Sequence, residues 1–566
     1  MSQRKTAVIT IFLVCLVLFF RKYDAFVNPQ FWAEDGILFD NWLQFGAKSF
    51  FLQYAGYINL FPRLVAFLAS FFPFSFTPAI YNYICLLVVL AICGWLFSSR
   101  LRLPYKPLFA LAIVLVPHGG ESFLNLPSIY WFMSLALVFL AIQEHPVGIW
   151  QILLDLFVLI LVGLSGPCIV YGLPLFALRC IAAHLSRLPL RRKIYDYLLL
   201  AGALVLLGAQ FYSLANSPNP TLRGAELCKN FDAWVRVLGN RYAGGLFFGV
   251  RLAALMSPWL LAGLTILLPF LLLILLDETP SVALRNIMNN RKSRLYTGTM
   301  FLLFAIGIAG CVLYKHRSME VPILSIQALA RIGDAERYFF IGYIMVLWTL
   351  ILCLESRPFK RGVTAFLLVL SLLASTANFQ WPPFTDYHWR DTVLRYGATI
   401  PRHPVDEMTS ITHIPINPPG CYVESKLAVN VVQDKTYSFR AVNSGGTEVY
   451  NQAEHKFDFP LRKNDIIRIQ ILPARPLESD DRAFIILYDP AQKSGEMIYH
   501  DQVIIPQGKR ILERDVKESL EAPVLVWRNW KASGSVLPET KIRICVIRPA
   551  ATGFKSVYDR ISRHVF

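Results

Sequence analysis

Long apolar runs recur along the first two-thirds of the chain, and they constrain the fold more than any other feature. The 566 residues are 55% hydrophobic and 16% charged, against about 25% charged residues in soluble domains. Runs near the roughly 20 residues that a bilayer requires predict transmembrane helices. The sequence therefore predicts a polytopic α-helical membrane protein. Its net charge of +17 is assigned to cytoplasmic loops and not to nucleic-acid binding.

About eleven apolar segments are expected to cross the membrane, and the first has no signal-peptide cleavage site and a cytoplasmic N-terminus. Residues 57–73 are expected to form a re-entrant or in-plane helix, because this places every later basic loop in the cytoplasm. The expected spans are residues 7–20, 79–97, 107–117, 128–142, 148–164, 168–182, 196–214, 257–276, 297–314, 338–353 and 363–378. The amphipathic segment 230–251 is expected to lie along the outer surface of the membrane.

The C-terminal third has a different composition. Residues 1–378 are expected to form the transmembrane domain, with an outer loop at 21–56, and residues 379–420 a membrane-surface helix and linker. Residues 421–566 contain short alternating strands, which predict an extracytoplasmic β-rich domain resembling an antiparallel sandwich. Cys421 and Cys545 lie near its two ends in an oxidising compartment, so a disulfide between them is predicted.

The outer loop carries an acidic pair, Glu34 and Asp35, close to the membrane surface. Placing a carboxylate there costs free energy, and such a cost is expected where the group has a function. The pair is therefore a candidate functional site. A carboxylate within hydrogen-bond reach could deprotonate a sugar hydroxyl. The alternative is that Asp35 caps the helix that follows it. We favour the catalytic interpretation, with Asp35 ahead of Glu34.

This arrangement resembles the GT-C superfamily of polytopic membrane glycosyltransferases. The resemblance rests on a first span, an outer loop with an acidic residue, an in-plane helix with the pattern Gly56-Tyr57 to Pro62-Arg63, and a second span. It implies transfer of a sugar from a polyprenyl-phosphate carrier to a glycan or glycolipid acceptor, at the outer face of a bacterial inner membrane. The plan is also similar to that of O-antigen-modifying glucosyltransferases, and the acidic residue would serve as base or orient the acceptor or a metal.

A set of outer residues is expected to bind substrate. Cations at headgroup depth suit a lipid-linked phosphodiester, because Arg binds phosphate oxygens in bidentate fashion. Snorkelling to lipid headgroups is the alternative for the cations, and a capping turn is the alternative for His118, Glu121 and Asn125. The substrate-binding candidates are Arg337, Arg331, Arg63, Lys315, Arg317, His118, Glu121, Asn125, Trp32 and Tyr57. The aromatic members, with Tyr54, would stack on sugar faces.

Two rival functions remain open. A lipid or polysaccharide transporter would need charged residues along a path through the bilayer, and Asp155 is the one clear candidate in the apolar spans. A non-catalytic envelope-assembly factor would work without the acidic pair. No phosphate-binding loop of the G-x-x-x-x-G-K-[ST] type occurs in the sequence. The cofactor is left undecided, with a divalent cation as an option.

Overall fold

The computed structural model describes the chain in two compact units. The first comprises Met1–Ala69 with Pro78–Thr385, and the second Ser70–Thr77 with Asp386–Phe566. The description covers all residues except 1–2, 55, 118–120, 187, 218–229, 277–293, 316–328, 330–335, 377–378, 380–382, 397–405, 407–409, 412–413, 417–420, 424–426, 429–430, 440, 444–448, 463–464, 474–480, 489–498, 505–510, 517–518, 520, 522–523, 532–539 and 549–566.

Each expected span coincides with a helix. These helices are α1 (Gln3–Arg21), α5 (Thr77–Trp95), α6 (Lys106–Leu115), α7 (Ile129–Ile142), α8 (Ile149–Gly163), α9 (Cys168–Leu185), α10 (Leu190–Ala215), α13 (Pro258–Leu275), α15 (Arg294–Lys315), α17 (Phe340–Cys353) and α18 (Pro358–Thr376). Among the described residues, seven helices are long and apolar enough to cross a membrane, namely α1, α5, α9, α10, α13, α15 and α18. The others are shorter, so the chain is a polytopic helical membrane protein and the count of eleven crossings stays a prediction.

Helices α7 and α17 form the core of the helical unit. Both are apolar on every face, which is the pattern of a helix surrounded by other helices. Nearly every side chain of the two is buried. Trp348 of α17 donates its indole N–H to the carbonyl of Phe109 at 3.0 Å and stacks on Phe139 of α7.

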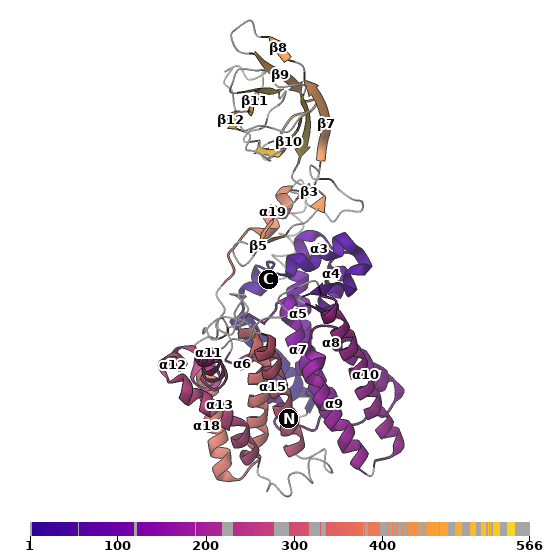
Figure 1. Ribbon diagram of the computed structural model, residues 1–566, viewed down its shortest axis with the longest axis vertical. Coiled ribbons are helices and arrows are strands. Elements are labelled where there is room, and N and C mark those ends of the chain that lie inside the picture. The colour runs from indigo at the N-terminus through magenta and orange to yellow at the C-terminus, as the bar shows by residue number, and fades with distance from the viewer. Residues whose placement is uncertain are drawn as a thin grey trace. The chain divides into compact units, whose positions relative to one another are not determined.

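Helices α8, α9 and α10 lie side by side along one flank of this core (Figure 1). Asp155 of α8 accepts a bidentate pair from Arg100, at 3.0 and 2.6 Å, and further hydrogen bonds from Gln143 and Tyr195. Asp155 is therefore the centre of a buried ionic network at the C-terminal end of α7. It is not a solitary intramembrane carboxylate.

Residues 230–255 form three consecutive helices, which include the expected amphipathic segment. They are α11 (Phe231–Leu238), the π-helix η5 (Gly239–Phe248) and α12 (Gly249–Leu255). Glycines let η5 approach its neighbours, since a Cβ at Gly239 would lie 2.4 Å from the Pro258 carbonyl oxygen. A Cβ at Gly245 would collide with the hydroxyl of Tyr343. This close packing explains the Gly-rich sequence.

The loop after α1 folds into short elements: α2 (Asp24–Val27), α3 (Asp35–Phe45), η1 (Gly46–Phe51), β1 (Gln53–Tyr54), β2 (Tyr57–Ile58) and α4 (Leu60–Ala69). The helix expected at 57–73 is present but begins at Leu60, because β1 and β2 pair as a hairpin. Trp42 packs on Phe67 and so joins α3 to α4. Gln210 of α10 bonds both backbone groups of Ile58 and the carbonyls of Gly163 and Gly166, which fixes the hairpin to the α8–α9 turn.

The second unit contains η2 (Phe74–Phe76), α19 (Trp389–Tyr396) and a series of strands. The extracytoplasmic β-rich domain expected here stays a prediction. The strands are β3 (Ser410–Ile411), β4 (Ile414–Ile416), β5 (Cys421–Val423), β6 (Leu427–Ala428), β7 (Val431–Phe439), β8 (Ala441–Asn443), β9 (Val449–Lys456), β10 (Ile466–Pro473), β11 (Asp481–Tyr488), β12 (Tyr499–Ile504), β13 (Ile511–Asp515), β14 (Val524–Lys531) and β15 (Thr540–Ile547). They form an antiparallel sheet ordered β13-β10-β15-β7, a second ordered β12-β11-β14-β9-β8, and two small pairs. A sandwich arrangement of the two larger sheets stays a prediction.

The disulfide predicted between Cys421 and Cys545 is wrong. Cys545 is a free and fully buried thiol in β15, a central strand between β10 and β7. Cys421 begins β5, which pairs with β4 in a separate two-stranded sheet. Placement near the two ends of the domain sequence therefore did not bring these cysteines together.

Candidate functional site

A polar cluster lies at the N-terminal end of α7, where the outer loop, the turn before α7 and the start of α17 meet. Tyr54 of β1 donates its hydroxyl to the Glu34 carboxylate at 2.7 Å. Burial raises the pKa of Tyr54, and the charge of Glu34 raises it further. The phenol therefore stays protonated and holds Glu34 in one position as a hydrogen-bond acceptor.

An ion pair contributes the cationic part of the cluster. Arg337, in the short helix η6 (Glu336–Tyr338), donates to Glu121 at 2.7 Å. Burial lowers the pKa of Arg337, but the charge of Glu121 and of neighbouring groups that include Glu34 outweighs it, so the net pKa is raised. The Arg337 side chain is 27% exposed, so the ion pair with Glu121 is only partly buried.

The turn before α7 holds Glu121 in place. Asn125 is buried and donates its side-chain amide to the Glu121 carbonyl at 3.2 Å. This bond belongs to the capping turn that was the alternative interpretation of Asn125. The Oδ1 of Asn125 is buried without a hydrogen-bond partner in the described part of the chain.

Tyrosine rings line the space between the two carboxylates. Tyr57 packs edge-on against Tyr54 and Tyr130, with centroids 5.9 and 6.2 Å away. Burial raises the pKa of Tyr57, and Arg337 and Glu34 both act on its charge, which places Tyr57 within electrostatic reach of both groups. Tyr338 lies beneath the Arg337 guanidinium, 5.4 Å from ring centroid to Cζ. A charged pair and a carboxylate bordered by phenol rings suit a hydroxyl-rich ligand such as a sugar.

Asp35 is buried and uses only one of its two carboxylate oxygens in a hydrogen bond within the described residues. Its side chain is 3% exposed; Oδ2 accepts the Trp32 backbone N–H at 2.8 Å, and Oδ1 has no partner among the described residues. Burial raises the pKa of Asp35 to about 8, Glu34 raises it too, and the Trp32 N–H and Lys22 oppose the shift. The carboxyl thus braces the start of α3, while Glu34 meets the tyrosine-lined cluster.

Lys22 is a functional candidate that sequence reasoning missed. It follows α1 directly, is buried, and donates its ammonium to the Phe123 carbonyl at 2.5 Å. Burial lowers the pKa of Lys22 to about 8, against the opposing charges of Cys85 and Asp35. Its neighbour Arg21 donates to the Val114 carbonyl at 2.6 Å. Two basic residues at the expected outer end of the first span run against the usual charge bias, and this was the available signal.

The backbone at the cluster is unusual. Ala33, directly before Glu34, has a φ of 42°, and Leu124, directly before Asn125, has a φ of 49°. Residues with a Cβ rarely adopt this left-handed conformation, and such strain gathers at functional sites. Gly166 has a φ of 127°, and a Cβ there would lie 3.0 Å from the ring of Tyr130. The turn between α8 and α9 therefore constrains the position of the Tyr130 ring.

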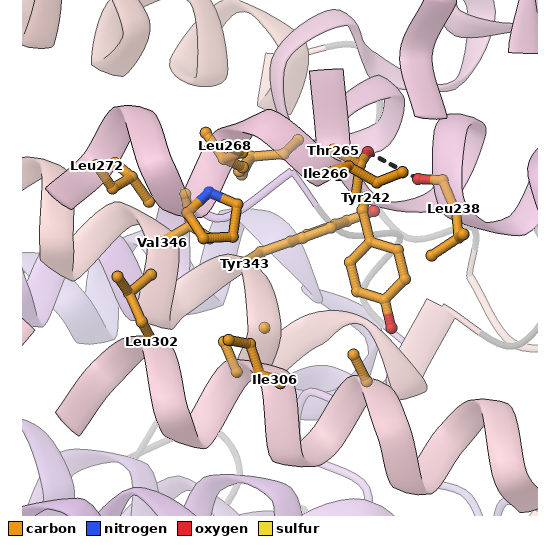
Figure 2. Close-up of a pocket in the computed structure, with 15 residues that line it drawn as sticks. Leu238, Tyr242, Thr265, Ile266, Leu268, Leu272, Leu302, Ile306, Tyr343 and Val346 are labelled. Carbon is orange, nitrogen blue, oxygen red and sulfur yellow. Dashed lines mark hydrogen bonds between the residues drawn. The ribbon is translucent and has the colours of Figure 1, made fainter. Parts of the chain in front are cut away.

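An apolar pocket of about 220 Å³ lies between η5, α13, α15 and α17. Figure 2 shows Tyr242 and Tyr343 among aliphatic side chains that include Leu272 and Ile306. Thr265 donates to the Leu238 carbonyl, so its polar group is used within the protein. The described residues that line it include no carboxylate and no basic group, so this pocket suits hydrocarbon and not a sugar or a phosphate.

Several predicted site residues lie elsewhere. Trp32 stacks on Phe384 with centroids 5.0 Å apart, so this protein contact already uses the ring. Arg63 is fully buried, and no charged group influences it. Lys315 ends α15, but its side chain lies outside the described residues, as do His118, Arg317 and Arg331. The structure thus brings together Glu34, Glu121, Asn125, Tyr57 and Arg337.

Comparisons with known proteins add no family to this description: no protein-family model, no curated protein and no solved structure matches the chain. Within the described residues, no group of three or more His, Cys, Asp or Glu side chains could hold a metal ion. The chemistry of the cluster must therefore be argued from its own geometry.

Proposed function

We propose that this chain is a membrane glycosyltransferase that moves a hexose or pentose from a polyprenyl-phosphate carrier to an envelope glycan or lipid acceptor. The observation that supports this most is the Glu34–Tyr54 pair in the same tyrosine-lined cluster as Arg337 and Glu121. A fixed carboxylate acceptor and a partly buried guanidinium are the two groups that such a transfer requires.

The chemistry would be a single displacement. The Glu34 carboxylate takes the proton of an acceptor hydroxyl, whose oxygen bonds to the anomeric carbon on the face opposite the phosphate. The bond from that carbon to the phosphate oxygen breaks, and the carrier phosphate leaves with the electron pair. Arg337 stabilises the phosphate as its charge develops, and one displacement inverts the anomeric configuration.

The apolar pocket is consistent with a lipid-borne substrate. Its residues Gly342 and Tyr343 lie at the start of α17, only five and six positions after Arg337. At about 1.5 Å of rise per helical residue, the pocket begins within roughly 10 Å of the Arg337 backbone along the helix axis. We propose that part of the carrier's hydrocarbon chain occupies it, at the outer face of a bacterial inner membrane.

The rival transport function has less support. Asp155, the carboxylate that made a transport path worth considering, accepts hydrogen bonds from Arg100, Gln143 and Tyr195. A carboxylate with these partners has little capacity left for a passing ion or substrate. The experiment below distinguishes the proposed transferase from a non-catalytic assembly factor.

Mass spectrometry of cell-envelope glycans tests the proposal. A deletion strain is complemented with wild type, Glu34→Gln, Asp35→Asn or Glu144→Gln at matched membrane levels. Glu144 is the control carboxylate, because it is half-buried and pairs with Arg102 outside the cluster. We expect the deletion to lose a hexose-sized or pentose-sized mass that Glu34→Gln fails to restore and the other variants restore. Full restoration by Glu34→Gln would favour the assembly factor.

A further inference from the structure

The segment from η1 to α4 contains a concentration of buried polar atoms without partners. Within the described chain, all three nitrogens of the Arg63 guanidinium and both side-chain amide atoms of Asn59 lack hydrogen bonds. Arg63 is 0% exposed and Asn59 is 1% exposed. Ser49 Oγ and Gln53 Oε1, from the same stretch of fifteen residues, are also buried without partners.

Nothing in the described chain offsets the charge of Arg63. No carboxylate forms an ion pair with it there, and burial is the sole influence on its ionisation. A buried guanidinium is retained in proteins when an anion or several acceptors meet its donors. The Glu34–Arg337 cluster does not supply the anion for Arg63, because the charges of the cluster do not act on the Arg63 guanidinium.

The donors lie close together in the sequence at the start of α4. Asn59 forms a β-bridge with Ser165 directly before Leu60, the first residue of the helix, and Arg63 lies in the first turn of α4. The backbone N–H groups of Leu60 and Phe61 already bond Leu164 and Ser165, so the side chains carry the unused donors. A guanidinium fork beside an amide matches an anion with several oxygens.

The surroundings indicate which anion fits. Leu68 of α4 is 48% exposed and Phe51 of η1 is 70% exposed, which is an apolar surface suited to the membrane interface. Phosphate is the anionic group found at that depth. We infer that Arg63 and Asn59 bind a phosphate group, that of a membrane lipid or free phosphate, at a site distinct from the Glu34 cluster.

The inference goes beyond the proposed transferase, and ligand binding to the resting protein tests it. The full-length protein, delipidated in detergent, is melted with mixed detergent micelles that contain phosphatidylglycerol, with mixed micelles that contain diacylglycerol, which lacks phosphate, or with inorganic phosphate. We expect phosphatidylglycerol to raise the melting temperature and diacylglycerol to leave it unchanged. A rise with inorganic phosphate as well assigns the site to phosphate in general, and its absence assigns it to the lipid.

Variants link the response to the site. Arg63→Gln should weaken the response to phosphatidylglycerol at least tenfold in concentration. Glu34→Gln and Arg102→Gln should respond as wild type, since Arg102 is an exposed arginine paired with Glu144. If Arg63→Gln does not fold, Asn59→Ala provides the test and should weaken the response severalfold. Equal shifts with diacylglycerol, or a wild-type response in the folded site variant, would overturn the inference.

Discussion

Replacing Asp35 by Asn should remove a pH dependence of stability that the buried carboxyl creates. Burial raises the folded-state pKa of Asp35 from 3.8 to about 8. Between these values the unfolded chain is ionised while the folded protein keeps the proton. The contribution of Asp35 to stability is therefore fully present below about pH 4 and is lost as the pH rises through about 8.

The magnitude follows from the size of this shift. Each pH unit inside that window is worth about 1.4 kcal/mol, so stability should fall by about 3 kcal/mol between pH 5 and pH 7. Lys22 does not contribute to this fall in stability. Burial lowers its folded-state pKa to about 8, so Lys22 is protonated in both the folded and the unfolded state between pH 5 and pH 7. Asn can still accept the Trp32 N–H, so the variant should match wild type at pH 5 within about 1 kcal/mol.

The assay is the melting temperature of the purified protein in detergent at pH 5, 6 and 7, followed by tryptophan fluorescence. We expect the wild type to lose on the order of 5 °C across this range and Asp35→Asn to lose much less of it. Glu144→Gln, at a half-buried carboxyl that pairs with Arg102, serves as control. A variant that keeps the wild-type slope would refute the burial argument. Loss of sugar transfer in Asp35→Asn at matched levels would refute the assignment of the base to Glu34.

Three further outcomes are expected. Asp155→Ala should lower the free energy of unfolding by about 3–5 kcal/mol in denaturant titrations, because it leaves a buried ion pair without its anion; a loss below 1 kcal/mol would contradict this. Gly166→Ala should reduce transfer more than tenfold, since its φ of 127° is strained for alanine and the added methyl meets the Tyr130 ring; wild-type glycan would disprove it. Tyr54→Phe should lower turnover about tenfold with the melting temperature held within 2 °C, because Glu34 loses its fixed partner; unchanged turnover would exclude that role.

The helical framework was predictable because lipid leaves the backbone few choices. A spanning segment must satisfy its own N–H and C=O groups, so an apolar run such as 196–214 becomes a helix, here the longer α10. Lengths were harder to predict. Helix α6 ends at Leu115 after ten residues, and a helix that short crosses a bilayer only with help from its surroundings.

The sequence predicted which residues belong to the candidate site, but it did not predict which of them contact each other. Glu121 and Arg337 are 216 positions apart, and only the packing of α7 against α17 makes them partners. Which residue of the acidic pair meets the tyrosine-lined cluster depends on the direction in which α3 begins. That direction buries Asp35 and directs Glu34 to Tyr54, and adjacent carboxylates carry no sequence signal that separates them.

The buried carboxylates at the two ends of α7 differ in whether both oxygens have hydrogen-bond partners. This difference distinguishes a structural carboxylate from one beside a functional site. At its C-terminal end, both oxygens of Asp155 accept hydrogen bonds, from Arg100, Gln143 and Tyr195. At its N-terminal end, Ala33 is strained and Asp35 keeps an oxygen without a partner in the described chain. A fold selected for stability alone would remove the strain at Ala33 and the unpaired oxygen of Asp35. Their persistence beside Glu34 is best explained by a ligand that uses this end of the bundle.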